Sequence, residues 1–145
     1  MHSKTSPTPR RAIKLLDTTF LIHYWAGTEA VREYLEAHEN TEFATTTLNI
    51  KEIAVGRKLQ GKLDTQEILT RFEWTTIIPF RTEHAVLAGE LEATLHETDV
   101  INRDRINALA GDVLIAAVAK DAGATVVTKN TGQFELFDGV AVESY

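Results

Sequence analysis

The stretch from Gly111 to Asn130, GDVLIAAVAKDAGATVVTKN, constrains the fold more than any other part of the sequence. Drawn as a helix, its first half is apolar on nearly every side, so this helix has to be buried. Gly123 is a typical helix stop, and the β-branched run TVVT after it predicts a strand. A buried helix that leads at once into a strand indicates a helix packed against a sheet.

The rest of the chain also alternates between apolar runs that predict strands and amphipathic stretches that predict helices. Such alternation indicates an α/β fold, here a layered sandwich with a mostly parallel sheet. The expected strands span 12–17, 42–46, 75–80, 125–128 and 139–145, and the expected helices begin at 18 and span 28–38, 48–59, 64–73, 83–96 and 111–122.

Length and composition indicate one domain in a reducing compartment. A chain of 145 residues with 43% apolar residues has material for one compact core and no room for a second. We expect a flexible tail at 1–11, where proline and basic residues gather, and a single domain at 12–145. No run is long and apolar enough for a signal peptide or a membrane span, so we expect a soluble, cytoplasmic protein.

Cysteine is absent from the sequence, and this limits the chemistry. Thiolate nucleophiles and sulfur-ligated zinc are excluded, which leaves oxygen and imidazole as metal ligands. The histidines show no spacing typical of zinc sites, and no glycine-rich phosphate-binding loop is present. Any metal site in this chain should therefore be built from oxygen ligands.

Four polar side chains are expected at one edge of the sheet. Asp17 and Asn130 follow predicted strands, whereas Glu52 and Asp112 lie at or near the N-terminal ends of predicted helices. In an open α/β sheet, such positions meet outside the carboxyl ends of the strands. Three carboxylates and one carboxamide form an oxygen-rich site, which suits Mg²⁺, with Mn²⁺ as its substitute, better than zinc.

A metal site of this kind is suited to cleaving phosphodiester bonds. That reaction needs a deprotonated water, a neutralised phosphoryl oxygen and a stabilised leaving group, all of which bound cations supply. Without metal, clustered carboxylates repel one another, so at least one should have a raised pKa. The sequence therefore predicts a strained acidic cluster that a cation relieves.

Each of these residues also has a purely structural interpretation. Asp17 and Asp112 can cap helices, which stabilises a protein by about 1 kcal/mol for each cap. Glu52 can be a solvated charge on a helix flank, and Asn130 can be a turn residue before Gly132. Only their predicted convergence distinguishes a site from these separate roles.

The formal net charge of −6 argues at first sight against a nucleic-acid ligand, because phosphate backbones are normally met by basic residues. If three acids belong to a metal site, bound cations neutralise their charges, and the remaining residues carry a formal charge of −3. The basic residues nearest the proposed edge in the sequence, which could hold RNA phosphates, are Lys51, Lys129, Arg103 and Arg105.

Three segments of the sequence resemble the motifs of PIN domains. LLDTTFLIHYW resembles the first acidic motif, TTTLNIKEIAVG the second, and GDVLIAAVAKDAGATVVTKNTGQF the third together with the segment that follows it. The resemblance extends from Ala12 to Tyr145 and, in length and motif style, points to the VapC toxins of VapBC toxin–antitoxin modules. It implies a PIN-like three-layer α/β/α sandwich and a metal-dependent ribonuclease.

By position, the resemblance makes Asp17, Glu52 and Asp112 the metal-binding acids of this chain. Asn130 stands at the fourth acidic position, where many PIN domains have Asp and VapC-like members often have Asn. The loss of one charge at this place favours one tightly held ion, with a second arriving with the RNA phosphate.

The resemblance also implies roles for flanking residues and for partners. Thr18 and Thr128 match hydroxyl residues beside the site in the family. The implied substrate is RNA, and Lys129 and Arg105 are candidates for contacting it. The implied protein partners are a second copy in a homodimer and an antitoxin that blocks the acidic crevice.

Further classes of function are left open by the sequence. A receiver-like signalling module would bind Mg²⁺ through Asp17 and switch through Thr128 and Lys129, but it would need a second acid where Thr18 stands. The sequence is also compatible with a stand-alone RNA-processing nuclease and with a PIN fold used only as an interaction scaffold. Removal of the Asp17 charge distinguishes a nuclease from a scaffold.

Overall fold

The computed structural model describes residues 12–98 and 101–145, so the flexible tail expected at 1–11 lies outside the described residues. The described chain alternates strands and helices, as the sequence predicts. In chain order the elements are β1 (Ile13–Leu16), α1 (Thr18–Ala26), α2 (Glu29–Ala37), β2 (Glu42–Thr46), α3 (Thr47–Leu59), α4 (Thr65–Arg71), β3 (Thr76–Ile78), α5 (Thr82–Glu97), α6 (Arg103–Ala108), α7 (Ala110–Ala122), β4 (Thr125–Val127), α8 (Thr131–Phe134) and β5 (Ala141–Glu143).

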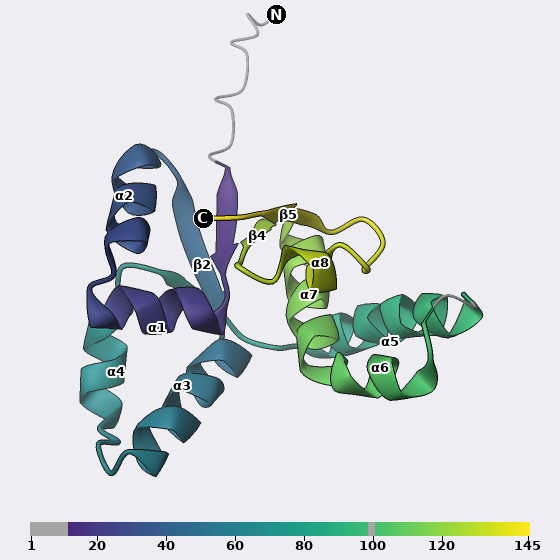
Figure 1. Ribbon diagram of the computed structural model, residues 1–145, viewed down its shortest axis with the longest axis horizontal. Coiled ribbons are helices and arrows are strands. Elements are labelled where there is room, and N and C mark those ends of the chain that lie inside the picture. The colour runs from purple at the N-terminus through teal and green to yellow at the C-terminus, as the bar shows by residue number, and fades with distance from the viewer. Residues whose placement is uncertain (1–11, 99–100) are drawn as a thin grey trace, which may run out of the picture.

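The strands form one sheet with helices on both faces. The strand order is β3-β2-β1-β4-β5, and every neighbouring pair is parallel. Helices α1 to α4 lie on one side of the sheet and α5 to α8 on the other (Figure 1). The predicted three-layer α/β/α sandwich is confirmed, and its sheet is parallel throughout the described chain.

Each face of the sheet has its own hydrophobic core, because successive side chains of a strand point to opposite faces. Leu15 of β1 and Val126 of β4 pack with α5, α6 and α7, whereas Leu16 and Val127 pack with α1, α2 and α3. All four side chains are fully buried. Because both faces of these strands are buried, their sequences do not alternate between apolar and polar residues at the carboxyl ends.

Helix α7 is buried along most of its length, as its sequence predicts. Residues 115–119 are at most 3% exposed, and the helix ends at Gly123, whose φ of 64° favours glycine. Its N-terminal end, which carries Asp112, reaches the surface. Although α7 is so apolar, no helix of the described chain is long and apolar enough to cross a membrane.

Two short helices, α6 and α8, occupy stretches for which the sequence predicts no regular element. Helix α6 begins after Asn102, whose Oδ1 accepts the backbone N–H of Arg105 at 2.8 Å. Helix α8 begins after Asn130, at the position where a turn is one of the sequence interpretations. The two helices have six and four residues, which is too short for a recognisable amphipathic period.

The sheet brings several helix starts to one edge. Strand β1 leads through Asp17 into α1, β2 leads directly into α3, and β4 leads to Thr128 and Asn130. Since β1 lies between β2 and β4, and parallel strands end at the same edge, these segments converge there (Figure 1). Asp17 therefore stands in the middle of the carboxyl edge of the sheet.

Candidate active site

Asp17 is the central residue of the site and is anchored through both carboxylate oxygens. Its Oδ1 accepts the backbone N–H of Phe20 at 2.9 Å, which makes Asp17 the N-cap of α1. Its Oδ2 accepts the hydroxyl of Thr128 at 2.5 Å, and this bond joins the ends of β1 and β4. Because Asp17 is only 5% exposed, its carboxylate has a fixed orientation.

Burial raises the pKa of the Asp17 carboxyl, because a buried charge loses its hydration. The hydrogen bonds from Thr128 and Phe20, and then the charge of His23, oppose this rise without cancelling it. Asp17 therefore carries its negative charge at a cost to the fold, which a bound cation would reduce.

Thr128 orients Asp17 and connects it to Asn130. The Thr128 hydroxyl donates to Asp17 and accepts the backbone N–H of Asn130 at 2.9 Å, so both of its hydrogen-bonding directions are used. Thr128 is fully buried, and its backbone N–H donates to the carbonyl of Glu143 on β5 at 2.9 Å. Thr128 thus supports the site and places Asn130 at the start of α8.

A small cleft of about 120 Å³ brings the predicted site residues together. Asp17, Glu52, Asp112 and Asn130 all line it, although they come from four separate segments of the chain. Thr18, predicted as a flanking residue, lines the cleft as well. The other lining residues are Thr19, Ile115 and Phe134.

The negative charges of the three acids act on one another in this cleft. Burial raises the pKa of Asp112 most, and the charges of Glu52 and Asp17 raise it further. The N-terminal end of α7 favours a carboxylate at this position, but burial and repulsion outweigh that effect. The cluster therefore has the electrostatic strain that the sequence predicts for acids gathered without a cation.

The three carboxylates, as placed, do not close around a single point. In residues 12–98 and 101–145, no three acidic or imidazole side chains form a group that could hold one ion. Glu52 is the exposed member of the three acids, on the flank of α3, so its side chain is the one free to rotate toward Asp17 and Asp112. The donor set itself, all oxygen and mostly anionic, fits Mg²⁺ or Mn²⁺.

Sequence reasoning misses Asn49, which connects two of the helix starts. Asn49 is fully buried in the first turn of α3, and its Nδ2 donates to the hydroxyl of Thr18 at 3.0 Å. It also forms a capping box with Thr46, the N-cap of α3. The sequence does contain a signal, because Asn49 stands three positions after Thr46, a residue type that commonly caps helices, and the second member of a capping box is found at this spacing.

Tyr145 is a second residue that sequence reasoning does not place near the site. Its hydroxyl is hydrogen-bonded to Nδ1 of His23 at 2.9 Å, and its ring packs edge-on against Phe20. Burial and the charge of Asp17 raise the pKa of Tyr145 to about 12. Lys129 donates to the Tyr145 carbonyl and lies 4.4 Å from the centre of its ring, so this predicted RNA contact is held beside the site.

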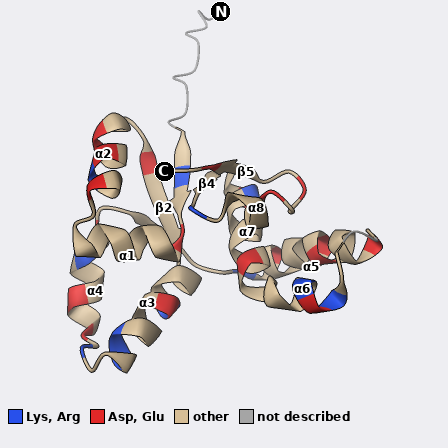
Figure 2. Cartoon of the chain, viewed as in Figure 1, with Lys and Arg blue, Asp and Glu red and all other residues tan. Residues whose placement is uncertain are grey.

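The other basic candidates, like Lys129, are not among the residues that line the cleft. Lys51 is exposed on α3 next to Glu52, and Arg103 and Arg105 are exposed on α6. The described residues that line the cleft include none of these three. Figure 2 shows Lys and Arg interspersed with Asp and Glu along α3, α4 and α6. RNA binding by these residues stays a prediction.

The family model of the PIN domain matches residues 14–140. The chain belongs to the PIN domain family. The matched region includes Asp17, Glu52, Asp112 and Asn130, and the match replaces the receiver-like interpretation. Comparison with curated protein sequences gives no match.

Solved structures share the fold of this PIN domain over nearly the whole chain. A chain of VapBC2 from Rickettsia felis, in a structure with a DNA fragment from the VapBC2 promoter, has a TM-score of 0.72 at 21% identity. The match covers 92% of this chain and 98% of that chain. A chain of FitAcB from Neisseria gonorrhoeae has a TM-score of 0.67 at 26% identity, and the match covers 89% of this chain and 95% of that chain. A chain of VapBC-1 from nontypeable Haemophilus influenzae has a TM-score of 0.70 at 16% identity, and the match covers 91% of this chain and 97% of that chain.

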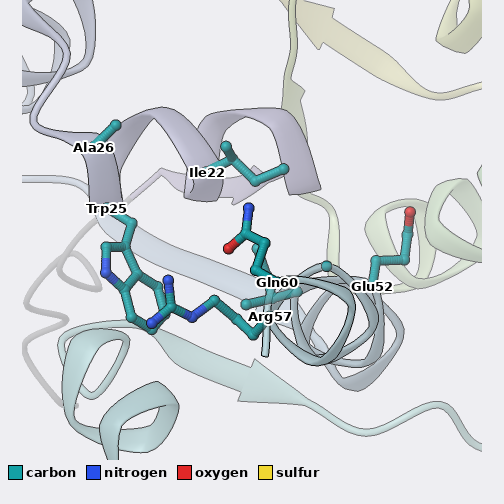
Figure 3. A pocket seen from close by; sticks show the side chains of 8 residues that line it. Ile22, Trp25, Ala26, Glu52, Arg57 and Gln60 are labelled. Carbon is teal, nitrogen blue, oxygen red and sulfur yellow. The ribbon is translucent and has the colours of Figure 1, made fainter. Parts of the chain in front are cut away.

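A second hollow of this PIN domain, the α1–α3 groove, lies beside the acidic cleft and has a volume of about 320 Å³. Figure 3 shows Trp25 with Arg57 stacked on it, and the guanidinium carbon lies 4.4 Å from the centre of the ring. Glu52 lines both the groove and the cleft, and its carboxylate points away from Trp25 (Figure 3). The other groove residues are Ile22, Ala26, Ile53, Gly56 and Gln60.

The raised pKa of Asp112 predicts how Asp112→Asn changes stability with pH. The folded chain binds the Asp112 proton more tightly than the unfolded chain does. This carboxyl therefore stabilises the fold fully below the ordinary Asp pKa of about 3.9, and that contribution is lost as the pH rises through the raised folded pKa. Asp112→Asn cannot ionise, so it should be more stable than the parent at about pH 7, with an advantage that shrinks toward about pH 4.

Denaturant unfolding of both proteins across this pH range measures the difference in unfolding free energy. Asp104→Asn is the matched control, because it removes an exposed acid from the first turn of α6, outside the cleft, and should bring no gain in stability. If Asp112→Asn is no more stable than the parent near neutral pH, the repulsion described for the cleft is wrong.

Proposed function

We propose that this PIN domain is a metal-dependent endoribonuclease that cleaves RNA phosphodiester bonds. One observation carries the proposal: Asp17, Glu52 and Asp112, together with Asn130, line a single cleft at the carboxyl edge of the sheet. Acids that raise the pKa of a neighbour are costly to the fold, and a cation-dependent reaction accounts for their being gathered there.

The four residues differ in how firmly the fold holds them. Asp17 is fixed by two hydrogen bonds, so it provides a rigid ligand, and Asp112 provides a second from the start of α7. Glu52, on an exposed flank, can turn inward when the charges of the other acids are neutralised. When bound, Mg²⁺ or Mn²⁺ would supply an activated water and neutralise charge on the phosphoryl oxygen. Asn130 is neutral, which favours one tightly held ion.

RNA is the substrate that the family resemblance implies, and the charge distribution limits how it can bind. The cleft is lined by acids, so the phosphates flanking the cut have to be held outside it. Lys129 at the margin of the site, Lys51 beside Glu52, and Arg105 on α6 are cations that can do this.

We further propose that this chain is the toxin of a toxin–antitoxin pair and acts as a homodimer. The likeness to chains of VapBC2 and FitAcB, which extends over nearly the whole chain, supports the toxin, whereas the homodimer rests on the family resemblance alone. The α1–α3 groove suits the apolar face of a helix from an antitoxin. Because Glu52 lines both hollows, an antitoxin seated in the groove would cover the acidic cleft.

Asp17→Asn should fold and lose cleavage. The asparagine carbonyl oxygen can still accept the backbone N–H of Phe20 and cap α1, while its amide N–H faces the Thr128 oxygen and donates to it in place of the lost acceptor. The side chain lacks the charge that holds a cation. Cleavage of an RNA oligonucleotide in Mg²⁺ buffer should fall by about 100-fold or more, the scale seen when one group that stabilises transition-state charge is removed. Gel-resolved cleavage rates and a melting curve measure the two properties separately.

Asp138→Asn is the matched control for charge, because Asp138 is exposed and lies outside the cleft. It should cleave as the parent does. If Asp17→Asn cuts RNA as fast as the parent, with contaminating nuclease excluded, the active-site assignment is wrong. Cleavage by the parent that survives chelation of divalent cations would contradict the metal dependence.

Filling the α1–α3 groove should weaken antitoxin binding. A side chain added at Gly56 enters open space, since a Cβ there meets nothing within 4 Å, and leucine favours a helix more than glycine does. Gly56→Leu should keep or raise the melting temperature and weaken binding of the antitoxin encoded beside this gene by about 10-fold, or about 1.4 kcal/mol. Co-expression of the two proteins followed by titration calorimetry measures the affinity.

Gly89→Leu on α5 is the matched control, because it makes the same change at another helical glycine with open space around it. It should leave antitoxin binding unchanged. Equal affinities for Gly56→Leu and Gly89→Leu would show that the groove is not the binding site. A neighbouring gene that encodes no binding partner would favour a stand-alone RNA-processing nuclease.

A further inference from the structure

A chain of hydrogen bonds runs beneath the acidic cleft from the end of β2 to the start of α1. Thr46 and Asn49, both fully buried, form the capping box of α3. Oδ1 of Asn49 accepts the hydroxyl of Thr46 at 2.6 Å and the backbone N–H of Thr46 at 3.3 Å. Nδ2 of Asn49 donates to the hydroxyl oxygen of Thr18 at 3.0 Å.

The backbone N–H of Thr46 fixes the direction of the bonds in this chain, because it can only donate. The atom of Asn49 that faces it therefore has to be the carbonyl oxygen, and the amide cannot be turned around. The amide nitrogen of Asn49 then faces Thr18, and it can only donate as well. The Thr18 oxygen is the acceptor, which leaves the Thr18 hydroxyl proton for another partner.

Thr18 lines the cleft, so its hydroxyl proton is available to a group that enters the cleft. Within the described part of the chain, the Thr18 hydroxyl accepts from Asn49 and donates to no protein group. The Thr128 hydroxyl is the opposite case, because it donates to Asp17 and accepts from Asn130. Of the two threonines, Thr128 supports the site from within, whereas Thr18 presents a donor to whatever enters the cleft.

We infer that Asn49 is a positioning residue that directs the Thr18 hydroxyl proton into the cleft, where Thr18 donates to a non-bridging phosphate oxygen of bound RNA. The inference rests on the proposed ribonuclease function. The carboxylates of the cleft repel a phosphate, whereas a neutral hydroxyl beside Asp17 offers it a charge-assisted hydrogen bond. Because Asn49 is fully buried and bonded on both sides of its amide, this direction is set before RNA binds.

Two substitutions test the inference, one at the hydroxyl donor and one at the residue that orients it. Thr18→Val removes the donor and keeps the shape of the side chain. Asn49→Asp keeps the acceptor for both donor groups of Thr46, so the capping box persists, but it has no N–H for Thr18. The Thr18 hydroxyl then donates to the new carboxylate, and its proton turns away from the cleft.

Thr18→Val and Asn49→Asp should each lower kcat/KM for an RNA oligonucleotide by about 10-fold, as expected for one lost hydrogen bond to a charged group. The double variant should be no slower than either single variant, because both remove the same donor. Thr18→Ser should restore the parent rate. Thr94→Val, which removes an exposed hydroxyl from α5, is the control and should cleave as the parent does.

Several outcomes would overturn the inference. Thr18→Val that cleaves at the parent rate would show that the hydroxyl does not contact RNA. If the two losses of kcat/KM multiply in the double variant, Asn49→Asp acts through its added charge or through folding and not through the Thr18 hydroxyl. If Asp17→Asn abolishes cleavage while Thr18→Val cleaves at the parent rate, the inference alone fails. If Asp17→Asn cleaves like the parent, the ribonuclease proposal fails, and this inference fails with it.

Discussion

The hydrogen bond from Thr128 to Asp17 is the interaction on which the rest of the site depends. It joins the ends of two neighbouring central strands, β1 and β4, and fixes one oxygen of a buried carboxylate. The other oxygen caps α1 through the backbone N–H of Phe20. One side chain therefore holds a strand pair and a helix start in place, so the site is built into the framework of the fold.

This framework also explains why the acids cannot relieve their repulsion by moving apart. Leu15 and Leu16 of β1 are buried on opposite faces of the sheet, which pins the strand that leads to Asp17. Asp112 is held at the start of the enclosed helix α7. Exposed Glu52 is the member of the three acids that can adjust its position when a ligand binds.

The sequence is sufficient to predict the layers of the fold and the three acids that line the cleft, because these depend on local patterns. Asp17 ends an apolar run, and Asp112 opens the helix that is apolar nearly all round. The bond from Asn49 to Thr18 spans 31 positions, and the contact of Tyr145 with a histidine spans 122. No local periodicity reports such contacts, and α6 and α8 are too short to show one.

We propose that the three carboxylates at the carboxyl edge of the sheet hold a divalent cation. Anomalous X-ray scattering from crystals soaked in Mn²⁺ tests it most directly. We expect one strong manganese peak in the cleft, bound by Asp17 and Asp112, with the Glu52 side chain rotated toward it. No peak in the cleft, or a peak elsewhere that leaves these three side chains in place, would show that the cleft is not a metal site.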